Sequence, residues 1–234
     1  MTLALGIAAV VLCALAGALS PAIVRRLPPP AADAGERPAD EPAPPSYPEV
    51  AASPWFAPAA ALGSAGGAAL VCLRLDAGWD WAVVLPAVPV LVVLALVDAR
   101  TRLLPSRLVL PATGLALAVT VTEAVIADDR APAVGGLIGL VAVRTAFWLL
   151  WWLHSAGLGF GDVRLAGLLG LLLGRLGLAE TFVGLYAAFV LFAVPGLVWA
   201  LVRRDRSLLK RAYPFGPFLV LGAFVGIALG PLWK

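Results

Sequence analysis

The sequence predicts an all-α protein, a polytopic membrane bundle of about eight transmembrane helices. Of its 234 residues, 62% are hydrophobic and only 13% are charged, whereas soluble domains carry about 25% charged residues. The apolar residues also gather into runs of about the 20 residues that a helix needs to span a bilayer. Arginines at the ends of the spans then explain the net charge of +3 better than a nucleic-acid-binding function does.

The expected helices follow one another along the chain with short polar breaks. The first, 2–24, has no basic residue ahead of its apolar run, so we expect a retained span rather than a signal peptide. The other seven are expected at 57–73, 81–97, 108–126, 133–153, 163–176, 178–202 and 213–232. The second and sixth of the eight are the least typical of membrane spans, because both are short.

The segment between the first two helices differs in kind. Residues 28–58 are dense in proline, alanine and acidic side chains, and proline supplies no backbone donor and fixes its own φ. We expect a mostly disordered connector, with a ligand for an SH3-type domain as the less favoured alternative. The chain is thus divided into a first transmembrane helix (1–24), a Pro/Ala-rich cytoplasmic linker (25–56) and a membrane core (57–234).

Basic residues predict the orientation of the helices. Twelve of the seventeen Lys and Arg residues fall in the loops 25–56, 98–107, 154–164 and 203–212, and four fall on the other side. Because positive charge is retained in the cytoplasm, we expect a multi-pass protein of the inner (plasma) membrane with both termini outside. The four basic loops, and any site they carry, are then cytoplasmic.

Arg144 lies near the middle of the fifth expected span. A charged side chain at that depth is costly unless it is paired. We therefore expect a structural ion pair rather than a catalytic role for Arg144, with Glu123, Glu180 or a polar cavity to compensate its charge.

Two carboxylates stand at the cytoplasmic ends of expected helices. Asp98 closes the run LALVD, and Asp162 follows the glycine-rich turn GLGFG. Gly159 and Gly161 permit tight turns beside Asp162, and Pro105 interrupts the chain after Asp98. A single interfacial Asp is commonly a helix cap. Two acids at one depth, on one side of a membrane protein, favour a functional site.

Two such carboxylates favour acid–base chemistry. If they lie within a few Å of each other they cannot both ionise, so one keeps a proton. One can then activate a water while the other protonates a carbonyl oxygen, as in aspartic proteases, and neither receives a fixed role. No metal and no cofactor are needed, and the two cysteines, Cys13 and Cys72, are too few for a cysteine-based metal site.

Four stretches together resemble the type IV prepilin peptidases, membrane aspartic proteases of the GxGD type. LVDARTRLLPSRLVLP and GLGFGDVRLAGLLGLLLG resemble the two aspartate motifs of that family. YPFGPFLVLGAFVG resembles its C-terminal segment, and GALSPAIVRRLP resembles the end of its first helix. The resemblance implies that Asp98 and Asp162 are the catalytic residues. We expect Gly216 and Pro217 to shape the start of the last helix near them.

The resemblance also implies a substrate, a prepilin or pseudopilin in the membrane, whose short basic leader is cut on the cytoplasmic side. Many family members insert a cytoplasmic domain with paired CxxC motifs and also methylate the new N-terminus. Here the corresponding position holds the linker, which contains no cysteine. Because such a zinc site needs four ligands, we expect a short, peptidase-only form, with methylation left to another protein. The sequence does not give the oligomeric state.

Other functions stay open. Buried carboxylates carry protons in transporters, although the sequence shows no repeat of the kind that many transporters contain. A structural subunit of a pilus or secretion assembly, with inactive aspartates, is a second alternative. A protease of the signal-peptide-peptidase type shares the GxGD string, but the loop ARTRLLPSRL favours the prepilin type.

Overall fold

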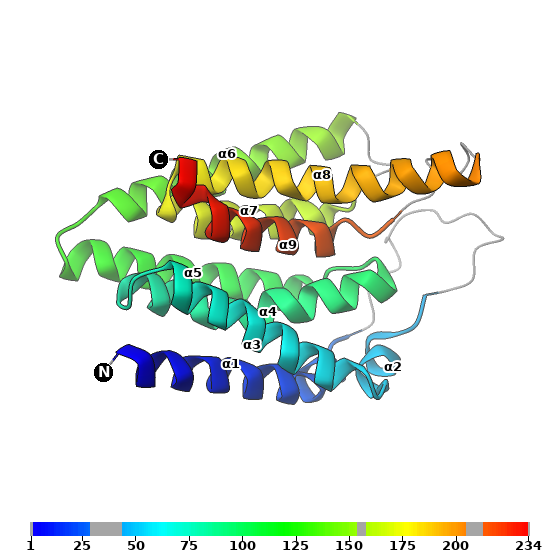
Figure 1. Ribbon diagram of the computed structural model, residues 1–234, viewed down its shortest axis with the longest axis horizontal. Coiled ribbons are helices and arrows are strands. Elements are labelled where there is room, and N and C mark those ends of the chain that lie inside the picture. The colour runs from blue at the N-terminus through cyan, green and yellow to red at the C-terminus, as the bar shows by residue number, and fades with distance from the viewer. Residues whose placement is uncertain (1, 29–43, 154–157, 205–212, 234) are drawn as a thin grey trace.

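The computed structural model describes residues 2–28, 44–153, 158–204 and 213–233. Within these ranges the chain is helical and contains no β-strand, and the long helices lie side by side along the length of the molecule (Figure 1). The elements are α1 (Thr2–Val24), α2 (Tyr47–Ala52), α3 (Phe56–Arg74), α4 (Trp79–Thr101), α5 (Ser106–Ile126), α6 (Ala131–Leu153), α7 (Phe160–Leu176), α8 (Leu178–Arg203), α9 (Gly216–Leu229) and the 3-10 turn η2 (Gly230–Trp233).

All eight expected segments are helical, which confirms the all-α membrane class. Six helices, α1, α3, α4, α5, α6 and α8, are long and apolar enough to cross a membrane, and α9 with η2 forms a shorter apolar helix. The main difference from the expected bounds is at α4, which continues to Thr101 and so places Asp98 inside the helix. The remaining segment, α7, is buried over most of its length, as a central helix should be.

Glycines bring two pairs of helices into close backbone contact. Between α6 and α7, a Cβ added to Gly135 would lie 2.5 Å from the carbonyl oxygen of Gly174. Between α8 and α9, a Cβ on Gly222 would lie 2.5 Å from the carbonyl oxygen of Gly184. Small residues at such contacts let helices in a membrane approach closely and gain van der Waals packing. The α6–α7 pair and the α8–α9 pair are therefore tightly joined.

The end of the expected linker is folded, so the expectation of disorder is wrong for this part. The hydroxyl of Ser46 accepts a hydrogen bond from the N–H of Glu49, whose carboxylate accepts one from the N–H of Ser46. This capping box starts α2, and Tyr47 and Val50 bury their side chains against α1 and α4. Composition does not report these pairwise contacts. The rest of the linker lies outside the described residues.

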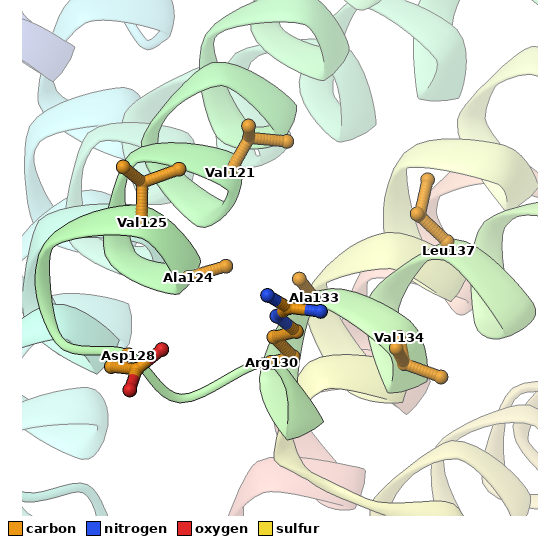
Figure 2. Close-up of a pocket in the computed structure, with 8 residues that line it drawn as sticks. All are labelled: Val121, Ala124, Val125, Asp128, Arg130, Ala133, Val134 and Leu137. Carbon is orange, nitrogen blue, oxygen red and sulfur yellow. The ribbon is translucent and has the colours of Figure 1, made fainter.

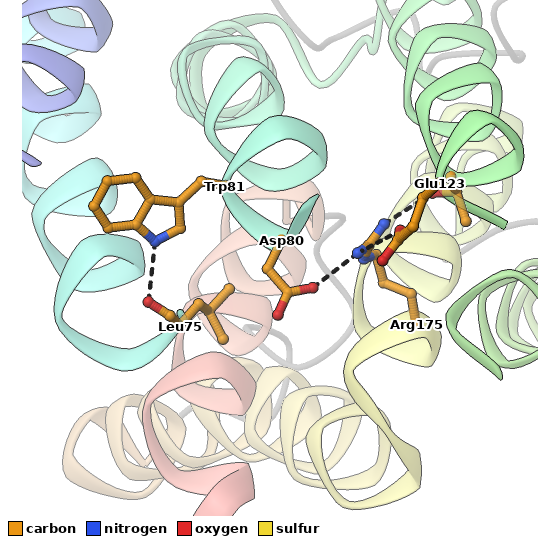
Figure 3. A network of polar contacts seen from close by, with 6 residues as sticks. Leu75, Asp80, Trp81, Glu123 and Arg175 are labelled. Carbon is orange, nitrogen blue, oxygen red and sulfur yellow. Dashed lines mark hydrogen bonds and ion pairs between the residues drawn. The ribbon is translucent and has the colours of Figure 1, made fainter. Parts of the chain in front are cut away.

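An ion cluster around the buried Arg175, with Asp80 and Glu123 as its partners, joins α7, α4 and α5 (Figure 3). Nη2 of Arg175 lies 2.8 Å from Oδ1 of Asp80 and 2.9 Å from Oε2 of Glu123. The Arg175 side chain is 0% exposed, and its Nη1 donates a hydrogen bond to the hydroxyl of Thr120. A buried arginine with two carboxylate partners fixes the ends of three helices relative to one another.

The expected pairing of Arg144 is wrong. Glu123 pairs with Arg175 instead, and Arg144 forms no ion pair with any residue that the structure describes. Arg144 is exposed, and its aliphatic stem lies against Gly167 of α7. Arg175 makes this contact because it lies in the buried last turn of α7, beside α4 and α5, whereas Arg144 is exposed on α6.

Candidate active site

Asp98 is held at the end of α4 by the start of α9. It lies one turn before the helix ends, and only 4% of it is exposed. Its Oδ2 accepts a hydrogen bond of 3.0 Å from the backbone N–H of Gly216, the first residue of α9. The first N–H groups of a helix have no partner within the helix and carry partial positive charge. They are therefore suited to orient a carboxylate.

Gly216 is required for this approach. A Cβ at that position would lie 2.7 Å from Oδ2 of Asp98, closer than any side chain tolerates. Pro217 follows in the first turn of α9, where a missing N–H costs no helical hydrogen bond. Gly216 thus lies beside Asp98, and Pro217 is the next residue of the same turn.

Asp162 lies in the first turn of α7 and is 7% exposed. Its Oδ2 accepts a hydrogen bond of 3.1 Å from the backbone N–H of Gly159, the N-cap residue. Its Oδ1 is buried and has no hydrogen-bond partner among the described residues. Leaving a buried polar atom in that state costs about 1–3 kcal/mol. This oxygen is available to a proton or to a bound group.

The two aspartates lie in one neighbourhood. A Cβ on Gly161, next to Asp162, would lie 2.8 Å from the Cβ of Leu104, in the turn that follows Asp98. The start of α9, which donates to Asp98, belongs to a helix that also packs against α7, the helix that carries Asp162. The structure therefore gathers at one end of the bundle the end of α4 and the starts of α7 and α9.

The turn between α4 and α5 is fixed by local contacts. Arg102 adopts a left-handed conformation with φ of 55°, and the hydroxyl of Thr101 accepts a hydrogen bond from the N–H of Leu103. Pro105 is buried and serves as the N-cap residue of α5. Pro105 thus shapes the loop after Asp98, and this loop is the one that packs against Gly161.

Neither aspartate forms an ion pair with a described residue, although arginines are close in sequence. The guanidinium of Arg100 lies over the ring of Trp55, at 4.5 Å from its centroid, and that of Arg164 lies 4.8 Å from the centroid of Phe160. Aromatic faces attract these cations. In the same described part of the chain, no cluster of three His, Cys, Asp or Glu side chains is placed to bind a metal ion.

Sequence reasoning missed an aromatic cluster beside the site, consisting of Phe147, Phe189, Phe192 and Phe215. The ring of Phe215, next to Gly216, lies 5.0 Å from that of Phe192, 5.4 Å from that of Phe189 and 6.1 Å from that of Phe147. Aromatic pairs prefer such separations. The cluster fixes the start of α9 against α6 and α8, and the phenylalanine of the segment YPFGP was its only signal in the sequence.

Tyr47 was also missed, because it was assigned to the linker. Its ring is buried in the cluster that α2 forms with α1, α3 and α4. Burial raises the pKa of the Tyr47 hydroxyl above its ordinary value, and the negative charge of Asp98 adds to the effect. Tyr47 therefore stays protonated at neutral pH, in a cluster that includes Val97, the residue before Asp98.

The comparisons with known proteins agree with this arrangement. The type IV leader peptidase family matches residues 85–201, a range that includes both aspartates. A prepilin leader peptidase/N-methyltransferase of Pseudomonas putida is 32% identical over 162 residues, which are 69% of this chain and 54% of that protein. One of the same name from Burkholderia pseudomallei (strain 1026b) is 32% identical over 185 residues, or 78% of this chain and 53% of that protein.

A third relative, also named a prepilin leader peptidase/N-methyltransferase, comes from Xanthomonas campestris pv. campestris. It is 30% identical over 160 residues, which are 65% of this chain and 51% of that protein. The chain spans about half the length of the curated relatives it matches. No solved structure matches it.

Proposed function

Because the chain belongs to the type IV leader peptidase family, we propose that it is an aspartic endopeptidase that acts on prepilin or pseudopilin leader peptides. Asp98 and Asp162 are its catalytic residues, and they activate a water between them. The observation that carries this proposal is the buried Oδ1 of Asp162, which has no partner among the described residues and lies where the turn after Asp98 packs against Gly161.

The hydrogen bonds to the two carboxyls support the chemistry. Each carboxyl has one oxygen held by a backbone N–H, from Gly216 for Asp98 and from Gly159 for Asp162. One proton is shared by the pair, because two neighbouring carboxylates cannot both ionise. The ionised carboxylate takes a proton from water as the water attacks the scissile carbonyl carbon. The protonated carboxyl donates to the carbonyl oxygen, and the new amine receives a proton as the C–N bond breaks.

The proposed substrate and orientation follow from the relatives' name and from the basic loops. The loops at the aspartate end carry most of the arginines, which favours the cytoplasmic side of the inner membrane. A substrate that enters from the bilayer as an apolar helix would bring its basic leader to that surface. We retain the division into a first helix, a cytoplasmic linker and a membrane core as part of this proposal.

We assign the peptidase reaction alone to this chain. The curated relatives are named for N-methyl transfer as well. Cys13 and Cys72 are free and lie in α1 and α3, not in the linker. A cysteine-based zinc site of the kind that longer family members carry has too few ligands here.

The test is cleavage of a co-expressed prepilin-like substrate, followed by mass spectrometry of its N-terminus. We expect Asp98→Asn and Asp162→Asn each to abolish cleavage while the protein stays in the membrane. Asp76→Asn, at an exposed acid between α3 and α4, is the matched control and should cleave normally. Cleavage retained in either site variant would disprove the pair. An intact leader with the wild-type protein would instead support an assembly subunit, and proton uptake into liposomes would support a transporter.

A further inference from the structure

A groove lies between α5 and α6 at the end of the bundle opposite the aspartates. α5 starts at the turn that follows Asp98 and runs for 21 residues, which is about 31 Å at the helical rise. Its last turn and the connection to α6 therefore reach the other membrane surface, at the far left in Figure 1. The groove has a volume of about 490 Å³.

The walls of the groove are apolar and face the lipid. They are formed by Val121, Ala124 and Val125 from α5 and by Ala133, Val134 and Leu137 from α6 (Figure 2). Val125 is 76% exposed, and Val121, Val134 and Leu137 are also exposed. In a helix that crosses a bilayer, a concave surface of this kind is in contact with hydrocarbon. It fits an acyl chain rather than a polar ligand.

The rim of the groove carries two opposite charges. Asp128 and Arg130 line it from the α5–α6 connection, and the guanidinium of Arg130 points into the space between the helices (Figure 2). Within the described residues, neither side chain has an ion pair or a hydrogen bond. The neighbouring Asp129 is occupied, because its Oδ1 accepts a hydrogen bond from the N–H of Ala131 at the start of α6.

We propose that this groove binds one phospholipid with a zwitterionic, ethanolamine-type headgroup. The phosphate pairs with Arg130, whose planar guanidinium can donate two parallel hydrogen bonds to it. The ammonium pairs with Asp128, and one acyl chain lies between α5 and α6. A phosphatidylglycerol would also meet Arg130, but it has no cation to offset Asp128 and Asp129. The two acids therefore select against a purely anionic lipid.

The test uses the full chain, purified in mild detergent and stripped of lipid. Native mass spectrometry then measures retention of phosphatidylethanolamine and of phosphatidylglycerol with the same acyl chains. We expect phosphatidylethanolamine to be retained preferentially. Arg130→Ala should weaken its binding about ten-fold, whereas Arg107→Ala, an exposed arginine at the other end of α5, should not.

Two further variants separate the headgroup from the chain. Asp128→Asn should remove the preference for phosphatidylethanolamine by strengthening phosphatidylglycerol, and Ala133→Phe should fill the groove and weaken both lipids. Equal retention of the two lipids by the wild-type protein would overturn the proposal. So would an Arg130→Ala variant that binds like Arg107→Ala, or an Ala133→Phe variant that binds like the wild type. Lipid retention is measured without substrate, so the result is independent of the peptidase proposal.

Discussion

The two ends of the same helices hold two pairs of carboxylates in opposite ways. At one end, Asp80 of α4 and Glu123 of α5 share the cation of Arg175 from α7. At the other end, Asp98 of α4 and Asp162 of α7 receive one backbone N–H each and no cation from the described residues. α4 and α7 thus contribute to both, and the presence of an arginine is what distinguishes them.

The difference teaches where the fold is stabilised and where it can do chemistry. A carboxylate that is paired with a buried arginine has its charge compensated, which suits it to joining helices. A buried carboxylate without a cation is costly, and such groups persist at functional sites because their proton affinity is useful there. The Arg175 cluster therefore joins helices, while the aspartate pair remains open to a proton, a water and a peptide bond.

The largest expected effect separates activity from stability at the aspartate end. Asp162→Asn should lower leader cleavage by about 10³-fold or more, since it removes acid–base catalysis. The same change should leave the free energy of unfolding equal or higher, because it removes a buried charge. The measurements are cleavage of a prepilin-like substrate and unfolding in detergent–SDS mixtures. A variant that loses stability along with activity would show that Asp162 is structural, like Glu123.

The second prediction reverses this pattern at the opposite end. Arg175→Met should lower the free energy of unfolding by about 3–5 kcal/mol, because it leaves Glu123 buried and without a cation. Cleavage per folded molecule should be unchanged. Adding Glu123→Gln should restore part of the lost stability, and Arg107→Met, at an exposed site, provides the control. If Arg175→Met alone unfolds like the wild type, the cluster is not a stabilising element.

The third prediction concerns the N–H group that holds Asp98. Gly216→Ala would place a Cβ 2.7 Å from Oδ2 of Asp98, so α9 or the carboxyl must shift, at a cost of about 1–3 kcal/mol. We expect cleavage to fall by about 10- to 100-fold, as a displaced group in an active site allows. Gly66→Ala is the control, because nothing lies within 4 Å of its added Cβ. Normal cleavage by the Gly216 variant would exclude a positioning role for α9.

The smallest expected effect is at Tyr47, which lies near Asp98 but outside the pair. Tyr47→Phe should reduce cleavage by about two- to five-fold, the range that a neutral hydrogen-bond donor contributes. Tyr186→Phe, at an exposed tyrosine of α8, should have no effect on the same assay. A loss as large as that of Asp162→Asn would make Tyr47 a member of the catalytic machinery.

The sequence predicted the helices well because each membrane span is a local apolar run. It also predicts a functional pair at Asp98 and Asp162, since an acid at the end of such a run is costly. It could not predict α2, whose stability depends on the Ser46–Glu49 capping box and on burial of Tyr47 against helices remote in sequence. Amino-acid composition does not show which residues make such contacts.

For a similar reason, the sequence could not predict which arginine pairs with Glu123. Glu123 could reach Arg144 or Arg175 in the helix arrangements that the apolar runs allow. Which arginine it meets depends on the rotation of α6 and α7 about their axes, and the glycine contacts set that rotation. The contacts of Phe215 with Phe147 and Phe189 likewise join residues from remote parts of the chain.

The glycine contacts have a consequence for how the carboxyls move. Asp162 is built into the α6–α7 pair, and Asp98 is tethered through Gly216 to the α8–α9 pair. Because the backbones of each pair touch, sliding within a pair would break these contacts, and we expect each pair to move as a unit. The distance between the two carboxyls can then change only where the α6–α7 pair meets the α8–α9 pair. A peptide that binds at the contact between the two helix pairs would change the distance between Asp98 and Asp162 without bending any helix.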